Sequence, residues 1–142
     1  MIIKTNSDKE TEKVGYTLAK ALDEKGIKDA YVALRGEMGV GKTVFTRGFG
    51  SYFGIEGIKS PTYTVVNEHH GAASLFHFDL YRISDDDDLT SIGYDDYLDR
   101  VGYKLVEWSE NTEEIPLDAI YVTISRDSSD DEARIIEISD FI

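Results

Sequence analysis

The spacing of apolar residues in the first part of the chain predicts a strand followed by an amphipathic helix. Residues 2–5 begin with two isoleucines and are typical of an edge strand. Ser7, followed three residues later by Glu10, is a capping box and marks a helix start. Beyond it, apolar side chains recur at helical spacing, at Val14, Leu18, Ala21 and Leu22. Gly26 is suited to ending that helix.

Further along, short apolar runs alternate with helical patterns and turn residues. Strands are predicted at 31–34, 63–66, 74–78 and 103–106, and a β-hairpin is predicted from 119–125 and 134–138. Helices are predicted at 42–53 and, as one or two short helices broken near Gly93, at 88–100. This order predicts an α/β fold with a mixed central β-sheet, flanking helices and a C-terminal β-hairpin.

A phosphate-binding motif lies between the predicted strand 31–34 and the predicted helix 42–53. Residues 36–43 read GEMGVGKT and fit the pattern G-x-x-x-x-G-K-[ST] at each constrained position. Glycines let successive backbone N–H groups turn toward a phosphate, a lysine supplies charge, and a hydroxyl faces Mg²⁺. A strand-to-helix junction is the context that this anion site needs. The chain is therefore predicted to be a single-domain P-loop NTPase over residues 1–142.

Composition narrows the choice of compartment and ligand. With 142 residues the chain is long enough for one domain, and its lack of cysteine excludes disulfides and thiolate metal sites. No apolar run approaches the length of a membrane span, so a cytoplasmic protein with no membrane association is expected. The net charge of −13 argues against direct binding to nucleic acid. Two acidic runs, 85–88 and 127–132, are interpreted as solvated loops rather than docking surfaces.

Two carboxylates are candidates for the metal and for catalysis. Asp79 follows the apolar run 74–78, and Glu107 follows 103–106, so both are expected where strand ends face a ligand crevice. Either could hold Mg²⁺, directly or through water, and either could orient the attacking water. Lys42 is expected to reach the β- and γ-phosphates, and Thr43 to offer its hydroxyl to Mg²⁺.

Other polar residues give weaker signals. Thr62, in Ser60-Pro61-Thr62, lies where many nucleotide hydrolases place a mobile segment that senses the γ-phosphate, although Ser-Pro also begins ordinary turns. Trp108 is by itself more typical of core or interface. The histidines show no metal-ligand spacing and are assigned no role.

Three functions remain open on these residues. An ATPase is favoured, a small-molecule kinase would use the same phosphate loop and acids, and a nucleotide-gated binding module would need no turnover. The chain contains no Asn-Lys-x-Asp element that would indicate guanine recognition, and no obvious arginine-rich lid typical of small-molecule kinases.

Taken in order, four segments resemble the TsaE family, also called YjeE. They are 36–43, SPTYT at 60–64, HFDLYR at 77–82 and VEW at 106–108, with ETEKVG at 10–15 extending the resemblance over most of the chain. The resemblance implies a small ATPase that binds ATP with Mg²⁺, hydrolyses it slowly alone, and works with the proteins TsaB and TsaD. Those partners transfer threonylcarbamoyl to adenosine 37 of tRNA. Any contact with tRNA would be indirect, through the complex.

The same resemblance suggests roles for individual residues. It implies that Lys42 and the loop amides hold phosphates, that Thr43 and Glu107 lie at the metal, and that Asp79 is the strand-end acid of the family. The cofactor-binding set it implies is Thr11, Glu37, Met38, Gly39, Val40, Gly41, Lys42, Thr43, Val44, Thr62, Trp108 and Arg134. Thr11 would lie near the base and Arg134 near the nucleotide. Val44 departs from a second hydroxyl that is common in the family, which leaves only its backbone N–H for the α-phosphate.

Overall fold

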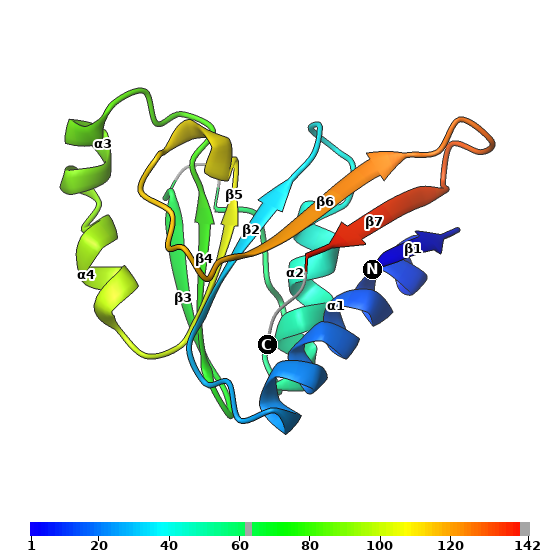
Figure 1. Ribbon diagram of the computed structural model, residues 1–142, viewed down its shortest axis with the longest axis horizontal. Coiled ribbons are helices and arrows are strands. Elements are labelled where there is room, and N and C mark those ends of the chain that lie inside the picture. The colour runs from blue at the N-terminus through cyan, green and yellow to red at the C-terminus, as the bar shows by residue number, and fades with distance from the viewer. Residues whose placement is uncertain (62–63, 140–142) are drawn as a thin grey trace.

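A mixed seven-stranded sheet forms the centre of the computed structural model, which describes residues 1–61 and 64–139 (Figure 1). The strand order is β1-β7-β6-β2-β5-β4-β3. The strands are β1 (Ile2–Thr5), β2 (Ala30–Arg35), β3 (Val66–His70), β4 (Ser74–Asp79), β5 (Tyr103–Glu107), β6 (Ile120–Arg126) and β7 (Arg134–Ile138). β6, β2, β5 and β4 pair in parallel, while β3, β7 and β1 add antiparallel pairings. The predicted mixed sheet and C-terminal hairpin are confirmed.

Helices cover both faces of the sheet. α1 (Asp8–Glu24) and α2 (Lys42–Tyr52) lie together on one face, and α3 (Asp86–Ser91) and α4 (Tyr94–Asp99) lie on the other (Figure 1). A short 3-10 helix, η1 (Ser109–Asn111), follows β5. The central strand β2 is buried on both sides: Val32 and Leu34 join the core under α1 and α2, whereas Tyr31 and Ala33 join the opposite core.

The N-terminal helix begins as its sequence predicts. Ser7 is the N-cap of α1 and accepts a hydrogen bond from the Glu10 backbone N–H at 3.2 Å, while the Glu10 carboxylate accepts one from the Asn6 backbone N–H at 3.1 Å. Glycines then let α1 approach α2 closely. A Cβ at Gly15 would lie 2.1 Å from the Phe45 carbonyl oxygen, and one at Gly48 would lie 1.8 Å from the Glu12 carbonyl oxygen.

Two local predictions are wrong. A strand was expected at 63–66, but among the described residues β3 begins only at Val66, because Val65 has a φ of 67° and cannot continue an extended strand. The acidic run 85–88 is not a loop but the start of α3, whose N-cap Asp85 accepts the Asp88 backbone N–H at 2.9 Å. Its carboxylates favour a helix N-terminus.

No helix in the described part of the chain, 1–61 and 64–139, is long and apolar enough to cross a bilayer.

Candidate functional site

The phosphate-binding motif forms a loop between the central strand β2 and the N-terminus of α2. Gly36, Gly39 and Gly41 have φ values of 147°, 74° and 117°, conformations that side-chain-bearing residues rarely adopt. Gly41 is the N-cap of α2 and has no side chain to satisfy the first N–H groups of the helix. Together with the helix dipole, these N–H groups form a site for an anion.

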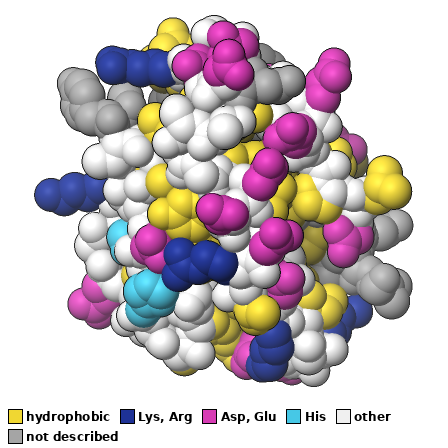
Figure 2. All heavy atoms as spheres, turned by 90° about the vertical axis from the view of Figure 1, so that its left-hand side faces the viewer, with side chains coloured by type: hydrophobic (Ala, Val, Ile, Leu, Met, Phe, Trp, Pro, Cys, Tyr) yellow, Lys and Arg dark blue, Asp and Glu magenta, His cyan; other side chains and the backbone are white. Residues whose placement is uncertain are grey.

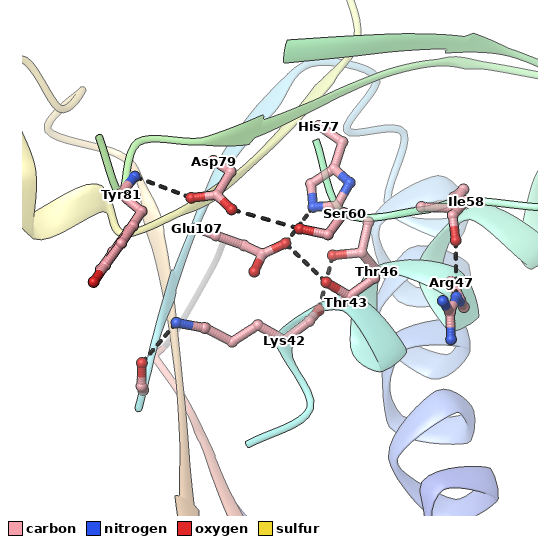
Figure 3. Close-up of polar contacts among 11 residues, drawn as sticks. Lys42, Thr43, Thr46, Arg47, Ile58, Ser60, His77, Asp79, Tyr81 and Glu107 are labelled. Atoms are coloured by element: carbon pink, nitrogen blue, oxygen red, sulfur yellow. Dashed lines mark hydrogen bonds and ion pairs between the residues drawn. The ribbon is translucent and has the colours of Figure 1, made fainter. Parts of the chain in front are cut away.

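Lys42 is held in place at this loop by uncharged groups. Its Nζ donates a hydrogen bond to the Gly36 carbonyl oxygen at 2.6 Å, drawn as the dashed line from Lys42 in Figure 3. The same Nζ lies 4.1 Å from the centre of the Trp108 ring. Burial lowers the pKa of Lys42, and the nearby charges of Glu107, Glu110 and Asp79 partly offset that effect. Burial disfavours the positive charge of Lys42, and a phosphate group beside the ammonium would stabilise that charge.

Asp79 and Glu107 end two neighbouring parallel strands. Asp79 is the last residue of β4 and Glu107 the last of β5, and they are direct register partners. Both are buried, with 8% and 5% exposure. Asp79 accepts a hydrogen bond from the Tyr81 backbone N–H at 3.0 Å and a long one, 3.5 Å, from the Ser60 hydroxyl. Burial raises the pKa of Asp79, and the Glu107 charge adds to that rise.

The Glu107 carboxylate connects the two sides of the site. Its Oε2 accepts a hydrogen bond from the Thr43 hydroxyl at 3.2 Å and lies 2.5 Å from His77 Nε2 (Figure 3). Thr43 uses its hydroxyl proton in this bond, so its oxygen lone pairs are still available to a metal ion. No role was assigned to His77 from the sequence, because metal-ligand spacing was the signal sought. Its position two residues before Asp79 on the same strand, and so on the same face, was the signal that could have found it.

These residues surround a cavity of about 230 Å³. Its lining comprises Met38, Gly39, Lys42, Thr43, Ser60, Asp79, Tyr81, Arg82, Glu107 and Trp108. A larger cavity of about 380 Å³ lies between β1 and α1. Its lining is mainly apolar, and it contains neither the loop glycines nor the paired acids. The smaller cavity is therefore the candidate functional site.

Strained backbone flanks both carboxylates. Among the described residues, Val65 and Trp108 are the non-glycine residues with positive φ, at 67° and 58°. The Val65 carbonyl accepts a hydrogen bond from the Asp79 backbone N–H at 2.8 Å, and Trp108 directly follows Glu107. Such conformations cost about 1–3 kcal/mol each and gather at functional sites.

The remaining candidate residues lie around the loop in different ways. Thr11 is buried, its hydroxyl is 2.9 Å from the Thr5 hydroxyl, and its methyl group faces Gly41. Arg134 donates from Nε to the Val40 carbonyl oxygen at 2.8 Å, so it braces the loop from β7. Glu37, Met38 and Gly39 are exposed, Val40 is buried, and Val44 is half-buried. Thr62 lies outside the described residues.

Comparison with known proteins identifies the family. The model of the family described as threonylcarbamoyl adenosine biosynthesis protein TsaE matches residues 5–136. The chain belongs to the TsaE family. Proteins of this family take part in the biosynthesis of threonylcarbamoyladenosine in tRNA.

Individual TsaE-family proteins match over most of the chain. The Haemophilus influenzae tRNA threonylcarbamoyladenosine biosynthesis protein TsaE is 40% identical over 129 residues, which cover 89% of this chain and 78% of that protein. The Bacillus subtilis protein of the same name is 39% identical over 107 residues, covering 73% of this chain and 66% of that protein. The crystal structure of Bacillus subtilis YdiB superposes with a TM-score of 0.76 at 29% identity, covering 96% of this chain and 82% of that one.

A second arginine at this TsaE-family site was missed in the sequence. Arg126, at the end of β6, donates from one guanidinium nitrogen to the Glu37 carboxylate at 3.1 Å and from another to the Met38 carbonyl oxygen at 3.3 Å. The C-terminal hairpin thus contacts the loop through Arg126 as well as Arg134. Strand pairing of β6 beside β2 places Arg126 there, and no local sequence pattern reports that long-range pairing.

Proposed function

We propose that this chain binds ATP with Mg²⁺, hydrolyses it slowly alone, and uses the cycle to support the tRNA threonylcarbamoyladenosine pathway. The convergence of Lys42, Thr43, Asp79 and Glu107 on one cavity carries the proposal. A loop of N–H groups, a lysine and a hydroxyl beside two strand-end carboxylates is the combination that phosphoryl transfer to water requires.

The residues present fit a magnesium nucleotide. In the proposal the uncapped N–H groups at Gly41 and Lys42 Nζ bind phosphate oxygens, and Lys42 exchanges its bond to the Gly36 carbonyl for one to phosphate. Among the residues that the structure describes, no three His, Cys, Asp or Glu side chains form a metal site of their own. A metal here would therefore rely on the phosphates and Thr43, as Mg²⁺ commonly does. Bound Mg²⁺ would neutralise charge on the transferring phosphoryl group.

Glu107 and Asp79 are given separate tasks. Glu107 accepts a hydrogen bond from the Thr43 hydroxyl, which would leave the hydroxyl oxygen free to face the metal, and Glu107 would itself lie near that metal. Within the described part of the chain, Asp79 accepts a short hydrogen bond from the Tyr81 N–H and a long one from Ser60, and it faces the same cavity. It is left to hold the metal through water or to orient the attacking water.

The proposed partners are the proteins TsaD and TsaB. In this scheme residues 1–142 act as one ATPase domain in the cytoplasm, where tRNA is modified, and tRNA is reached only through the complex. The chain performs no threonylcarbamoyl transfer. Its hydrolysis resets the partner complex between catalytic cycles, with the segment around Ser60 and Thr62 responding to nucleotide.

Two substitutions test the proposal: Lys42→Ala and Glu107→Ala. ATP affinity, ATP hydrolysis and multi-turnover tRNA modification with purified TsaB and TsaD are measured for each, with the exposed pair Lys20→Ala and Glu24→Ala as matched controls. Lys42→Ala should weaken ATP binding about 100-fold, since removing a charged partner costs about 3 kcal/mol. Glu107→Ala should retain binding and lose hydrolysis.

The outcomes also separate the alternatives. If Glu107→Ala loses hydrolysis yet supports modification through many turnovers, the chain is a nucleotide-gated binding module and the required-ATPase proposal is wrong. If phosphate appears on an added metabolite rather than in solution, the chain is a kinase. Wild-type hydrolysis that stops in EDTA and rises with TsaB and TsaD would support the proposal.

A further inference from the structure

His77 is a fully buried polar side chain beside the site and is not part of the cavity lining. Its side chain is fully buried, and its Nε2 is 2.5 Å from Glu107 Oε2. β4 and β5 are neighbours in the sheet, and His77 pairs in register with Leu105, two residues before Glu107. The imidazole therefore lies on the same face as Asp79 and Glu107, and beyond the Glu107 carboxylate as seen from Lys42 (Figure 3).

The chemistry of this contact fixes which atom carries the proton. A carboxylate has no proton to give, so the hydrogen bond requires a proton on His77 Nε2. Nδ1 has no hydrogen-bond partner among the described residues. From the residues that the structure describes, Glu107 Oε2 accepts two hydrogen bonds, one from Thr43 and one from His77, which leaves Oε1 for the cavity. These two donors restrict the carboxylate to one orientation.

The two donors are not equivalent. Thr43 is half-exposed at the start of α2, next to the loop that must receive phosphates, and its hydroxyl is itself a candidate metal ligand. His77 comes from a buried strand and has no part in binding phosphate. Removal of His77 would leave a buried carboxylate held from one side only. The orientation of the carboxylate would then depend on Thr43 alone, whose hydroxyl is also a candidate metal ligand.

We propose that His77 is a positioning residue that holds the Glu107 carboxylate in its working orientation through an Nε2–H bond. The inference rests on the proposed function, because it supplies the support that the metal-side carboxylate needs. His77 contacts neither nucleotide nor metal in this scheme. It acts on hydrolysis through Glu107 alone.

Two amide variants separate positioning from packing. In His77→Gln the side-chain amide nitrogen reaches the place of Nε2, whereas in His77→Asn it reaches only the place of Nδ1. Both replacements are neutral and polar, so the free energy of burying them is similar. They differ in whether they can donate a hydrogen bond to Glu107. His70→Asn and His70→Gln, at an exposed histidine of β3, are matched controls. Thermal unfolding of all four variants establishes that each is folded.

The first measurement is ATP hydrolysis resolved into kcat and KM. His77→Asn should lower kcat by about 10- to 100-fold, the usual cost of losing a partner that orients a metal-site ligand, with KM for ATP nearly unchanged. His77→Gln should retain most of the wild-type kcat. Equal losses in the Gln and Asn variants, or a loss expressed mainly in KM, would overturn the inference.

The second measurement needs no activity and no nucleotide. The chain has 3 histidines, so imidazole ¹⁵N spectra of labelled protein can be assigned with single substitutions. His77 should be protonated at Nε2, and this signal should shift or broaden in Glu107→Ala but not in Glu24→Ala. Crystal structures should show the Glu107 carboxylate displaced in His77→Asn and retained in His77→Gln.

The two measurements can refute the proposed function and the role of His77 separately. A wild-type chain that does not hydrolyse ATP would refute the proposed function, while the spectra and crystal structures would still decide the role of His77. A proton found on Nδ1, or a Glu107 carboxylate unmoved in His77→Asn, would refute the positioning role even in a fully active ATPase.

Discussion

Asp79 and Glu107 are direct neighbours across the β4–β5 pairing, each the last residue of its strand. Burial is the main factor that disfavours the charge of Asp79, and repulsion by Glu107 adds to it, while His77 and Lys42 partly offset both. This pair of carboxylates therefore destabilises the folded protein when no ligand is bound. That cost is the usual mark of a site built for a cation or a proton transfer rather than for stability.

The first prediction is that Asp79→Asn stabilises the nucleotide-free protein while impairing hydrolysis. The amide keeps an acceptor for the Tyr81 N–H and removes the buried charge facing Glu107. Urea denaturation in EDTA should give a higher free energy of unfolding than wild type. Asp118→Asn, at an exposed turn residue outside the helices, should leave it unchanged. A less stable Asp79→Asn protein would show that the two carboxylates do not destabilise one another.

The contact of α1 with α2 gives the second prediction. A methyl group at Gly48 would lie 1.8 Å from the Glu12 carbonyl oxygen, and backbone on both sides leaves no flexible side chain to yield. Gly48→Ala should therefore lower the free energy of unfolding by about 2 kcal/mol or more, the cost of overpacking. Lys20→Ala, at an exposed position of the partner helix α1, should change it by less than about 0.5 kcal/mol. Indistinguishable urea curves for the two variants would contradict the close approach.

The third prediction concerns pH and a surface interaction far from the cavity. Asp23 accepts hydrogen bonds from Lys28 and, at 2.7 Å, from the Tyr52 hydroxyl, and these bonds lower its pKa below the usual 3.8. A carboxylate with a lowered folded-state pKa stabilises the protein above the unfolded value and loses that contribution as pH falls through the folded value. Asp23→Asn should therefore be less stable than wild type at pH 7.

The difference in free energy of unfolding between wild type and Asp23→Asn should shrink once pH falls below 3.8 and vanish in stronger acid. At the alkaline end, the hydrogen bond to Asp23 raises the pKa of Tyr52 to about 12. This contribution is present below the usual value of 10 and disappears as pH rises toward 12. Urea denaturation of wild type, Asp23→Asn and Tyr52→Phe at a series of pH values from 3 to 12 measures the acid and the alkaline effect on the free energy of unfolding. A gap between wild type and Asp23→Asn that widens in acid would refute the assignment.

Much of the fold could be predicted because its local patterns agree with the tertiary structure. The capping box at Ser7 and the hairpin ending in β7 appear where the sequence places them. The break near Gly93 separates α3 from α4, as expected of a glycine with φ of 76°. β3 was misplaced because most of this edge strand, Asn67 to His70, is polar. The apolar residue Val65 just before it lies in a strained turn instead of in the strand.

The candidate site was predictable where one motif or one strand end carries it. Lys42, Thr43, Asp79 and Glu107 were named from the sequence, and the structure brings them around one cavity. The contacts that join them depend on strand order, which the sequence does not state. His77 reaches Glu107 only because β4 lies beside β5, and Arg126 reaches the loop only because β6 lies beside β2. Thr62 stays a prediction.

The final prediction is that the isolated protein does not bind tRNA measurably. Its net charge is −13, and Asp87, Asp95, Asp96 and Asp99 are exposed along α3 and α4, where Figure 2 shows acidic side chains spread over that face. Tight tRNA binding needs clustered Lys and Arg to replace counterions, and this surface would instead repel the phosphate backbone. The prediction follows even for a protein of a tRNA-modifying pathway, provided that partners contact the RNA.

Gel-shift titrations of tRNA with the isolated protein at moderate salt should show no complex, with and without ATP and Mg²⁺. A variant with Asp87, Asp95, Asp96 and Asp99 changed to Asn is the matched control for repulsion by the α3–α4 face. If it also fails to bind, the chain lacks an RNA site. If it binds, the acidic face had masked one. A wild-type shift that weakens as salt rises would refute the prediction, because that salt dependence is the signature of phosphate contacts.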